Sequence, residues 1–329
     1  MFRASLFVFS VFLSFHAYSA ELTIYSVRSE GGMRPLLDRF TAETGIQTKF
    51  VGGTHPELMA KLQAEGKSTP ADVFITKDLV YQGEATRLGV FQPFASEIVE
   101  KNIPGQFIEP ARHWYLLSYR ARVIMYNVNK VNPAELSTYK GLGDSQWAGR
   151  LCVRTAQNSY NHGLFASFVH NLGFEPTVAV LKSWMRNLAT PPIATDTDVL
   201  KAIAAGQCDV GVTNTYYLAF LLEKDSSFPV RPFFPEQGGV GAHVNGGGIG
   251  IVKHSRNVDA ATKFLEFMSR SDVQTDYASP HHEYPANPSS APTDIVRTFG
   301  PFRADAGNIG VISTNSDLGV KAATEAGYN

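Results

Sequence analysis

Three tyrosines stand where their phenol oxygens could bind a hard metal ion. Tyr216 and Tyr217 follow the strand-like run 208–213 and open a helical pattern, with Asn214 or Thr215 as its N-cap. The positive end of a helix favours phenolate over phenol, and a trivalent cation would displace the phenol proton. The alternative is a pair of aromatic residues packed in the core.

Tyr160 occupies a similar place, in the polar turn 158–161. This turn follows the strand-like run 151–154 and precedes a helical pattern that begins at Leu164. Ligands of α/β folds bind where strands end and helices begin, so the three tyrosines could converge on one point. Taken alone, a tyrosine in a polar turn is equally well explained as structural.

Two further loops carry charged side chains at the ends of strands. Arg28 and Glu30 follow the run 22–25 and precede a helix. Arg28 could hold an anion or stabilise phenolates, and Glu30 could supply a carboxylate oxygen. Lys77 and Asp78 follow the strand-like run 72–76. The alternative for both loops is a solvated polar turn.

Composition and motifs exclude several other functions. The 329 residues carry 29 basic and 30 acidic side chains, which leaves no basic field for nucleic acid. Two cysteines cannot build an all-cysteine zinc or iron–sulfur site. The Gly246–Gly248 run has neither dinucleotide-binding nor P-loop spacing, and GxSxG is absent. His281 and His282 lack HExxH spacing, so we interpret them as surface residues.

Residues 1–20 have the pattern of a cleaved signal peptide. Arg3 precedes a short apolar run, and small residues allow cleavage after Ser19. The run is about half as long as a membrane span needs, so we expect a soluble protein outside the cytoplasm. There Cys152 and Cys208 can form a disulfide, worth about 4 kcal/mol in the chain-entropy model. Two buried free thiols are the alternative.

The order of apolar patterns predicts an α/β protein of two lobes, each about 150 residues. The backbone is expected to cross between the lobes near 116–123 and 247–252, whereas the tail 280–329 has less clear order. We expect strands at 22–25, 46–51, 72–76, 119–126, 208–213 and 246–252, and helices at 33–44, 56–65, 164–172, 178–188, 199–205, 216–224 and 258–268.

Seven segments together resemble the periplasmic ferric-ion-binding proteins of ABC importers, which have the type II solute-binding fold. The resemblance covers about 22–325. The segments are LTIYSVR at 22–28, GKSTPADVFIT at 66–76, SYRARVIMYN at 118–127, LCVRTAQNSYN at 151–161, AAGQCDVGVTNTYYLAFL at 204–221, HVNGGGIGI at 243–251 and EYPAN at 283–287.

The resemblance implies that Tyr160, Tyr216 and Tyr217 are ligands of Fe(III). Relatives often place His or His-Tyr where this chain has Ser29 and Glu30, so the usual donors of the first lobe are missing. Glu30, water or a small anion such as carbonate would complete the iron shell. Groups expected around the iron or the anion are Arg28, Ser29, Lys77 and Asn158.

The implied architecture is a signal peptide at 1–20, lobe 1 at 21–118 plus 247–290, and lobe 2 at 119–246 plus 291–329. The implied function is capture of Fe(III) in the interlobe cleft and delivery to an ABC permease of the inner membrane, by a monomer with no catalytic step. One alternative keeps the fold and binds an anion, an organic phosphate or a ferric chelate through Arg28, Lys77 and Arg154. A secreted hydrolase is the alternative of another class.

Overall fold

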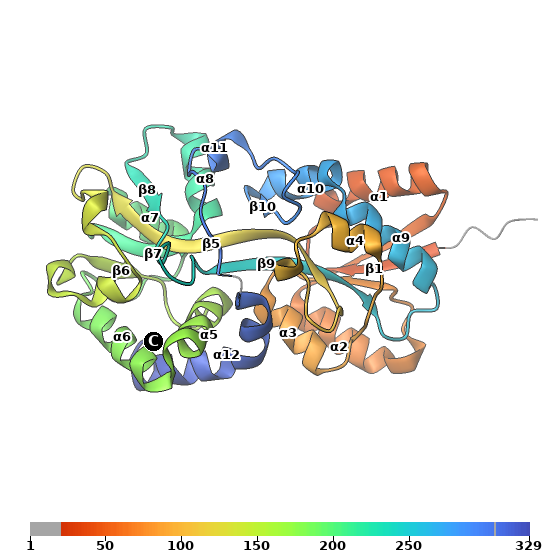
Figure 1. Cartoon of the computed structure of the whole chain (residues 1–329), viewed down its shortest axis with the longest axis horizontal. Helices are drawn as coiled ribbons and strands as arrows, with labels where there is room; N and C mark the ends of the chain where they lie inside the picture. The colour runs from red at the N-terminus through yellow and green to blue at the C-terminus, as the bar shows by residue number, and fades with distance from the viewer. Residues whose placement is uncertain (1–20, 306) are drawn as a thin grey trace, which may run out of the picture.

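Two long strands connect the halves of the molecule in the computed structural model, which describes residues 21–305 and 307–329. Strand β5 (Tyr115–Asn127) pairs with β9 (Val244–Val252) along its first part. From Arg122 onward it pairs instead with β7 and β8 of the other half. The strands therefore run from one lobe into the other, as Figure 1 shows. The predicted signal peptide lies outside the described residues.

Lobe 1 is built on the order β2-β1-β3-β9, in which β1 is parallel to both β2 and β3. The predicted β-α-β-α-β opening is present, and helix α1 begins three residues earlier than its apolar spacing indicates. The elements of this lobe are β1 (Glu21–Ser26), α1 (Glu30–Thr44), β2 (Gln47–Gly52), α2 (His55–Glu65), β3 (Val73–Ile75), α3 (Leu79–Arg87), β4 (Phe91–Gln92), α4 (Glu97–Asn102), α9 (Val258–Ser269), α10 (Ser271–Ala278) and β10 (Tyr284–Pro285).

Lobe 2 continues the sheet in the order β5-β7-β6, with β6 parallel to β7. The predicted disulfide is present beside these strands, where Cys152 and Cys208 are joined with their Cα atoms 5.8 Å apart. The elements of this lobe are β6 (Leu151–Val153), α5 (Ser159–Leu172), α6 (Phe174–Arg186), α7 (Asp196–Ala204), β7 (Val210–Asn214), α8 (Thr215–Lys224), β8 (Val230–Phe233), α11 (Asp294–Arg297) and α12 (Asn308–Glu325).

The C-terminal tail is more ordered than its composition suggests. Helix α12 lies along α5 and reaches α3 of lobe 1 (Figure 1). Gly319 allows this close packing, because a Cβ atom there would come within 2.7 Å of the backbone nitrogen of Ala166. Ile312 belongs to the core of lobe 1, and Tyr328, just beyond the helix, belongs to the core of lobe 2. Tertiary packing therefore stabilises a helix that is poor in strong helix formers.

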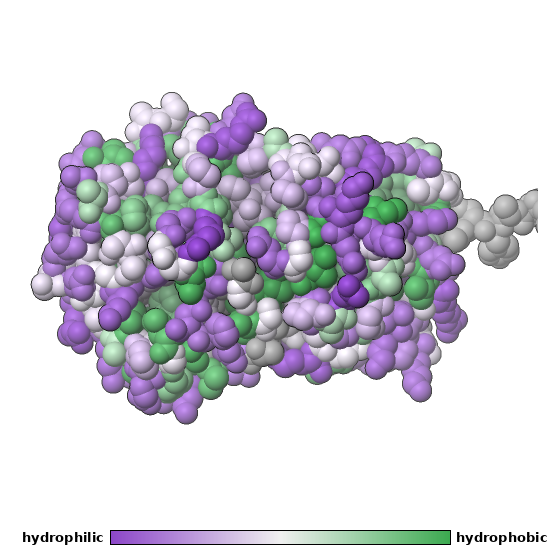
Figure 2. Space-filling model, viewed as in Figure 1, coloured by the Kyte–Doolittle hydropathy of each residue, from purple (hydrophilic) through white to green (hydrophobic). Residues whose placement is uncertain are grey.

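The surface of the molecule mixes polar and apolar side chains. Polar side chains cover much of the face in Figure 2, and apolar residues are interspersed over both halves. Among the described residues, no helix is both long enough and apolar enough to cross a membrane.

Candidate metal centre

The three tyrosines meet at the start of two helices. Tyr160 lies in the first turn of α5, and Tyr216 and Tyr217 lie in the first turn of α8. The hydroxyl of Tyr216 donates a hydrogen bond of 3.2 Å to the hydroxyl of Tyr160. The ring of Tyr217 packs against that of Tyr216, with 4.1 Å between centroids. The structure thus brings together side chains 56 residues apart.

Sheet topology explains this convergence. Strands β6 and β7 are parallel neighbours, so the segments that leave their carboxyl ends emerge on the same edge. Asn158 caps α5 by accepting a 2.9 Å hydrogen bond at Oδ1 from the backbone nitrogen of Tyr160. Asn214 precedes α8 as its N-cap residue, without a side-chain cap bond. The local order strand, cap, tyrosine is therefore repeated at the two positions.

Burial favours the protonated form of Tyr160 and Tyr216 when no metal is bound. Burial, followed by interaction with Tyr160 and Tyr217, raises the pKa of Tyr216 well above its ordinary value. Burial also raises the pKa of Tyr160, although the charge of Arg120 acts in the opposite direction. Desolvation thus acts against the helix field, which favours phenolate.

Guanidinium groups surround the phenols. Arg120 lies over the ring of Tyr160 at 5.0 Å, and Arg154 lies 5.8 Å from the same ring. Burial lowers the pKa of Arg154, but interaction with Asp196 and Tyr217 raises it above its ordinary value. Behind them, the fully buried Asp196 accepts bonds of 2.9 Å from Arg122 and 3.0 Å from Arg154. Positive charge thus lies where a set of phenolates would need it.

Lobe 1 presents a different arrangement at the expected positions. Arg28 forms a 2.5 Å ion pair with the buried carboxylate of Glu283 and donates to the hydroxyl of Tyr277. Glu30 is exposed and paired with Arg34 of the same helix. The structure records no contact between Glu30 and the tyrosines.

Two other candidates of lobe 1 are also exposed. Ser29 precedes α1 without a side-chain cap bond. Lys77 has an exposed side chain, and its carbonyl oxygen accepts a 2.6 Å hydrogen bond from Arg120. The structure therefore gathers the tyrosines with Asn158 but leaves Ser29, Glu30 and the Lys77 side chain at the surface.

Several residues at the site carry roles that sequence reasoning missed. Arg120 and Arg122 both lie in β5, and both are buried. A charged residue inside an apolar strand usually pairs with a buried acid, so this pattern could have indicated their role. Glu283 lies in EYPAN and gave no separate signal. His282 is buried rather than exposed, because the turn at φ 49° packs its ring against Phe220.

The candidate metal ligands of the centre are oxygen atoms. Within residues 21–305 and 307–329, no group of three or more His, Cys, Asp or Glu side chains could hold a metal ion. The phenol oxygens of Tyr160 and Tyr216 are close enough to share one ion. Phenolate oxygen suits a hard, highly charged cation.

The fold defines a class, the two-lobed solute-binding proteins. Residues 36–298 match the family model for bacterial extracellular solute-binding proteins, and the chain belongs to that family. Members of this family bind solutes for transport, in agreement with the expectation of a binding protein rather than an enzyme. The resemblance on which the sequence analysis relied is thereby confirmed.

Relatives with iron in their names cover nearly the whole chain. Iron uptake protein A1 of Synechocystis is 38% identical over 94% of this chain and 87% of its own length. A Trichodesmium protein in complex with iron and citrate ligands is 35% identical, with a TM-score of 0.90 over 94% of this chain and 100% of its own. The open ferric iron-binding protein A of Mannheimia haemolytica is 33% identical, with a TM-score of 0.85 over 94% and 99%.

Proposed function

We propose that this protein captures ferric ion between its lobes and delivers it to an ABC permease of the inner membrane. The observation that carries the proposal is the 3.2 Å contact between the hydroxyls of Tyr160 and Tyr216, with Tyr217 packed alongside. Three phenolates would neutralise the charge of one ferric ion. The names of the Synechocystis and Mannheimia relatives support iron as the solute.

The binding cleft lies between lobe 1, at 21–118 plus 247–290, and lobe 2, at 119–246 plus 291–329. Strands β5 and β9 cross between these parts and are the natural hinge. We further propose that residues 1–20 are a signal peptide that directs the protein to the periplasm, where it acts as a monomer. The periplasmic relative from Serratia marcescens supports that location.

A small anion completes the iron shell in this proposal. Arg28 forms an ion pair with Glu283, so its guanidinium is a weaker candidate for binding the anion than the sequence suggests. The Nε atoms of Arg120 and Arg154 are buried beside the tyrosines with no recorded hydrogen-bond partner. Carbonate would fit such donors, and so would the carboxylates of a ferric chelate. The iron and citrate ligands of the Trichodesmium relative support the chelate as a second candidate.

The test is a visible spectrum combined with metal analysis. Protein loaded with ferric ion should show a phenolate-to-iron charge-transfer band and about one iron per chain. Tyr216→Phe and Tyr217→Phe should each lose much of this band. Loading in bicarbonate and in citrate, with analysis of the bound anion, separates the free ion from the chelate. An iron-treated protein that stays colourless would refute the proposal.

A further inference from the structure

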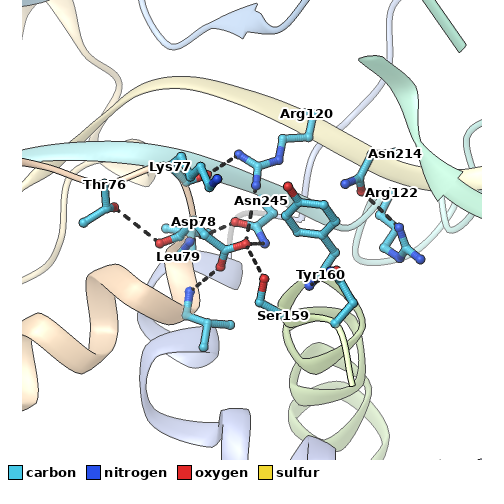
Figure 3. A network of polar contacts seen from close by, with 12 residues as sticks. Thr76, Lys77, Asp78, Leu79, Arg120, Arg122, Ser159, Tyr160, Asn214 and Asn245 are labelled. Atoms are coloured by element: carbon cyan, nitrogen blue, oxygen red, sulfur yellow. Dashed lines mark hydrogen bonds and ion pairs between the residues drawn. The ribbon is translucent and has the colours of Figure 1, made fainter. Parts of the chain in front are cut away.

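A serine hydroxyl joins the two lobes directly beside the tyrosine site. Ser159, the first residue of α5, donates from Oγ to Oδ2 of Asp78 at 3.1 Å (Figure 3). Asp78 is the N-cap of α3 in lobe 1 and is fully buried. Ser159 immediately precedes Tyr160. The contact therefore fixes the helix turn that carries one of the phenols.

The same carboxylate oxygen gathers groups from both hinge strands. Asp78 Oδ2 also accepts from Asn245 Nδ2 of β9 at 3.2 Å and faces Arg120 Nη2 of β5 at 3.5 Å. The other oxygen, Oδ1, accepts from the backbone nitrogen of Val80 within α3. One oxygen thus serves its own helix, and the other contacts the hinge and lobe 2. Opening the lobes would remove the Ser159 donor from a buried carboxylate, which is unfavourable.

Tyr81 of lobe 1 interacts electrostatically with the same serine. Burial raises the pKa of the Tyr81 phenol, and interaction with the Ser159 hydroxyl acts in the opposite direction. The ring of Tyr81 stacks on His55, with centroids 4.2 Å apart and planes 10° apart, and so is held in place within lobe 1. Asp78 is therefore the lobe 1 residue that holds Ser159 by a hydrogen bond.

We propose that Asp78 is a positioning residue that holds Ser159 and thereby keeps Tyr160 in place in the closed, iron-loaded protein. Lobe 1 then contributes to iron retention through this clasp, by which we mean Asp78 and Ser159. This inference rests on the proposed function. It assigns lobe 1 a part that requires no metal donor from the loop after β1.

Two substitutions remove the clasp while preserving the helices. Ser159→Ala leaves α5 capped, because the cap is Asn158. Asp78→Asn keeps a good N-cap for α3 but replaces the carboxylate oxygen with an amide group. Ser271→Ala is the matched control, since Ser271 is likewise the first residue of a helix, α10.

The experiment measures how fast iron leaves the full-length mature protein for excess EDTA after loading with ferric ion in bicarbonate. We expect Ser159→Ala and Asp78→Asn each to release iron about tenfold faster, as loss of a hydrogen bond to a charged group implies. The double variant should be no faster than the faster single variant, because both changes break one contact. The wavelength of the charge-transfer band should not change, and Ser271→Ala should behave as the wild type.

Other outcomes would overturn the inference. Unchanged release from Ser159→Ala, or additive effects in the double variant, would show that Asp78 does not act through Ser159. A shifted band in Tyr81→Phe would make Tyr81 an iron ligand, so that lobe 1 would act as a metal donor and not through the clasp. If the wild type takes up no iron, the proposed function fails instead. Small-angle scattering of the metal-free protein then decides: the clasp variants must be more expanded than the wild type, and identical profiles refute the clasp.

Discussion

At the place where the two lobes meet, lobe 1 has side chains with ionic partners, whereas lobe 2 has tyrosine phenols. In lobe 1, the charge of Arg28 is neutralised by Glu283, and Glu30 is paired with Arg34 at the surface. In lobe 2, the partly buried hydroxyls of Tyr160 and Tyr216 contact each other. The charges of these lobe 1 residues are therefore already paired. Lobe 2, in contrast, presents oxygens that a cation could bind.

This contrast shows where binding free energy can come from. An ion pair that is already satisfied gains little from a ligand, because the ligand must first displace the existing partner. The phenols of lobe 2 differ because a bound trivalent ion can replace their protons, although the pKa values raised by burial make that replacement more costly. Lobe 2 is thus expected to supply the chemistry, and lobe 1 the closure.

The largest effect that tests this contrast is the pH dependence of iron affinity. The raised pKa values mean that Tyr160 and Tyr216 are protonated at neutral pH and must release their protons when they bind iron as phenolates. Affinity should therefore fall with falling pH, by about 100-fold per unit for these two phenols together, since each released proton contributes tenfold. Calorimetry in buffers of different ionisation enthalpy counts the released protons.

A variant that lacks one phenol tests the number of protons released on iron binding. Tyr216→Phe should release one proton fewer per iron than the wild type. Carboxylate donors from lobe 1 would already be ionised at neutral pH, so they would release none. Uptake of iron with less than one proton released would therefore assign the donors to acidic side chains and reverse the contrast between the lobes.

A smaller effect is expected on the stability of the scaffold behind the tyrosines. Asp196 bridges two guanidiniums in lobe 2 and is fully buried. Asp272 bridges two guanidiniums in lobe 1, those of Arg39 and Arg270, but its side chain is 48% exposed. Asp196→Asn should lower the free energy of unfolding by about 3 kcal/mol, because it leaves the buried Arg122 charge without its partner. Asp272→Asn should cost less than about 1 kcal/mol.

Urea unfolding of the metal-free variants measures both values. The two substitutions have the same chemistry and the same number of partners, so burial is the difference that matters. Equal losses would show that the Asp196 network is no more important to lobe 2 than a surface ion pair is to lobe 1.

Much of the fold, and the tyrosine cluster as a candidate site, could be predicted from sequence because local signals were strong. Parallel strands followed by capped helices predict that Tyr160, Tyr216 and Tyr217 lie on one edge of the sheet. Contacts between distant segments carried no local signal. The pairing of Arg28 with Glu283 joins residues 255 positions apart, and no periodicity reveals it.

The tail shows a second reason for failure. The sequence of α12 contains glycine, serine, threonine and asparagine, all of which disfavour a helix in isolation. Its order depends on packing against α5, where Gly319 allows close contact. His282 is buried for a similar reason, since its turn fits against α8. Tertiary packing decided both features.

The smallest expected effect concerns Glu30, the one acidic group of lobe 1 that sequence reasoning put forward as an iron donor. Its side chain is 58% exposed and lies beside Arg34, one turn along α1. Glu30→Gln should change iron affinity by less than about twofold, since a surface i,i+4 pair contributes only a few tenths of a kcal/mol. Competition with a chelator at fixed pH measures the change. A loss of tenfold or more would mean that α1 delivers its carboxylate to the metal on closure, and lobe 1 would then be a donor as well as a clasp.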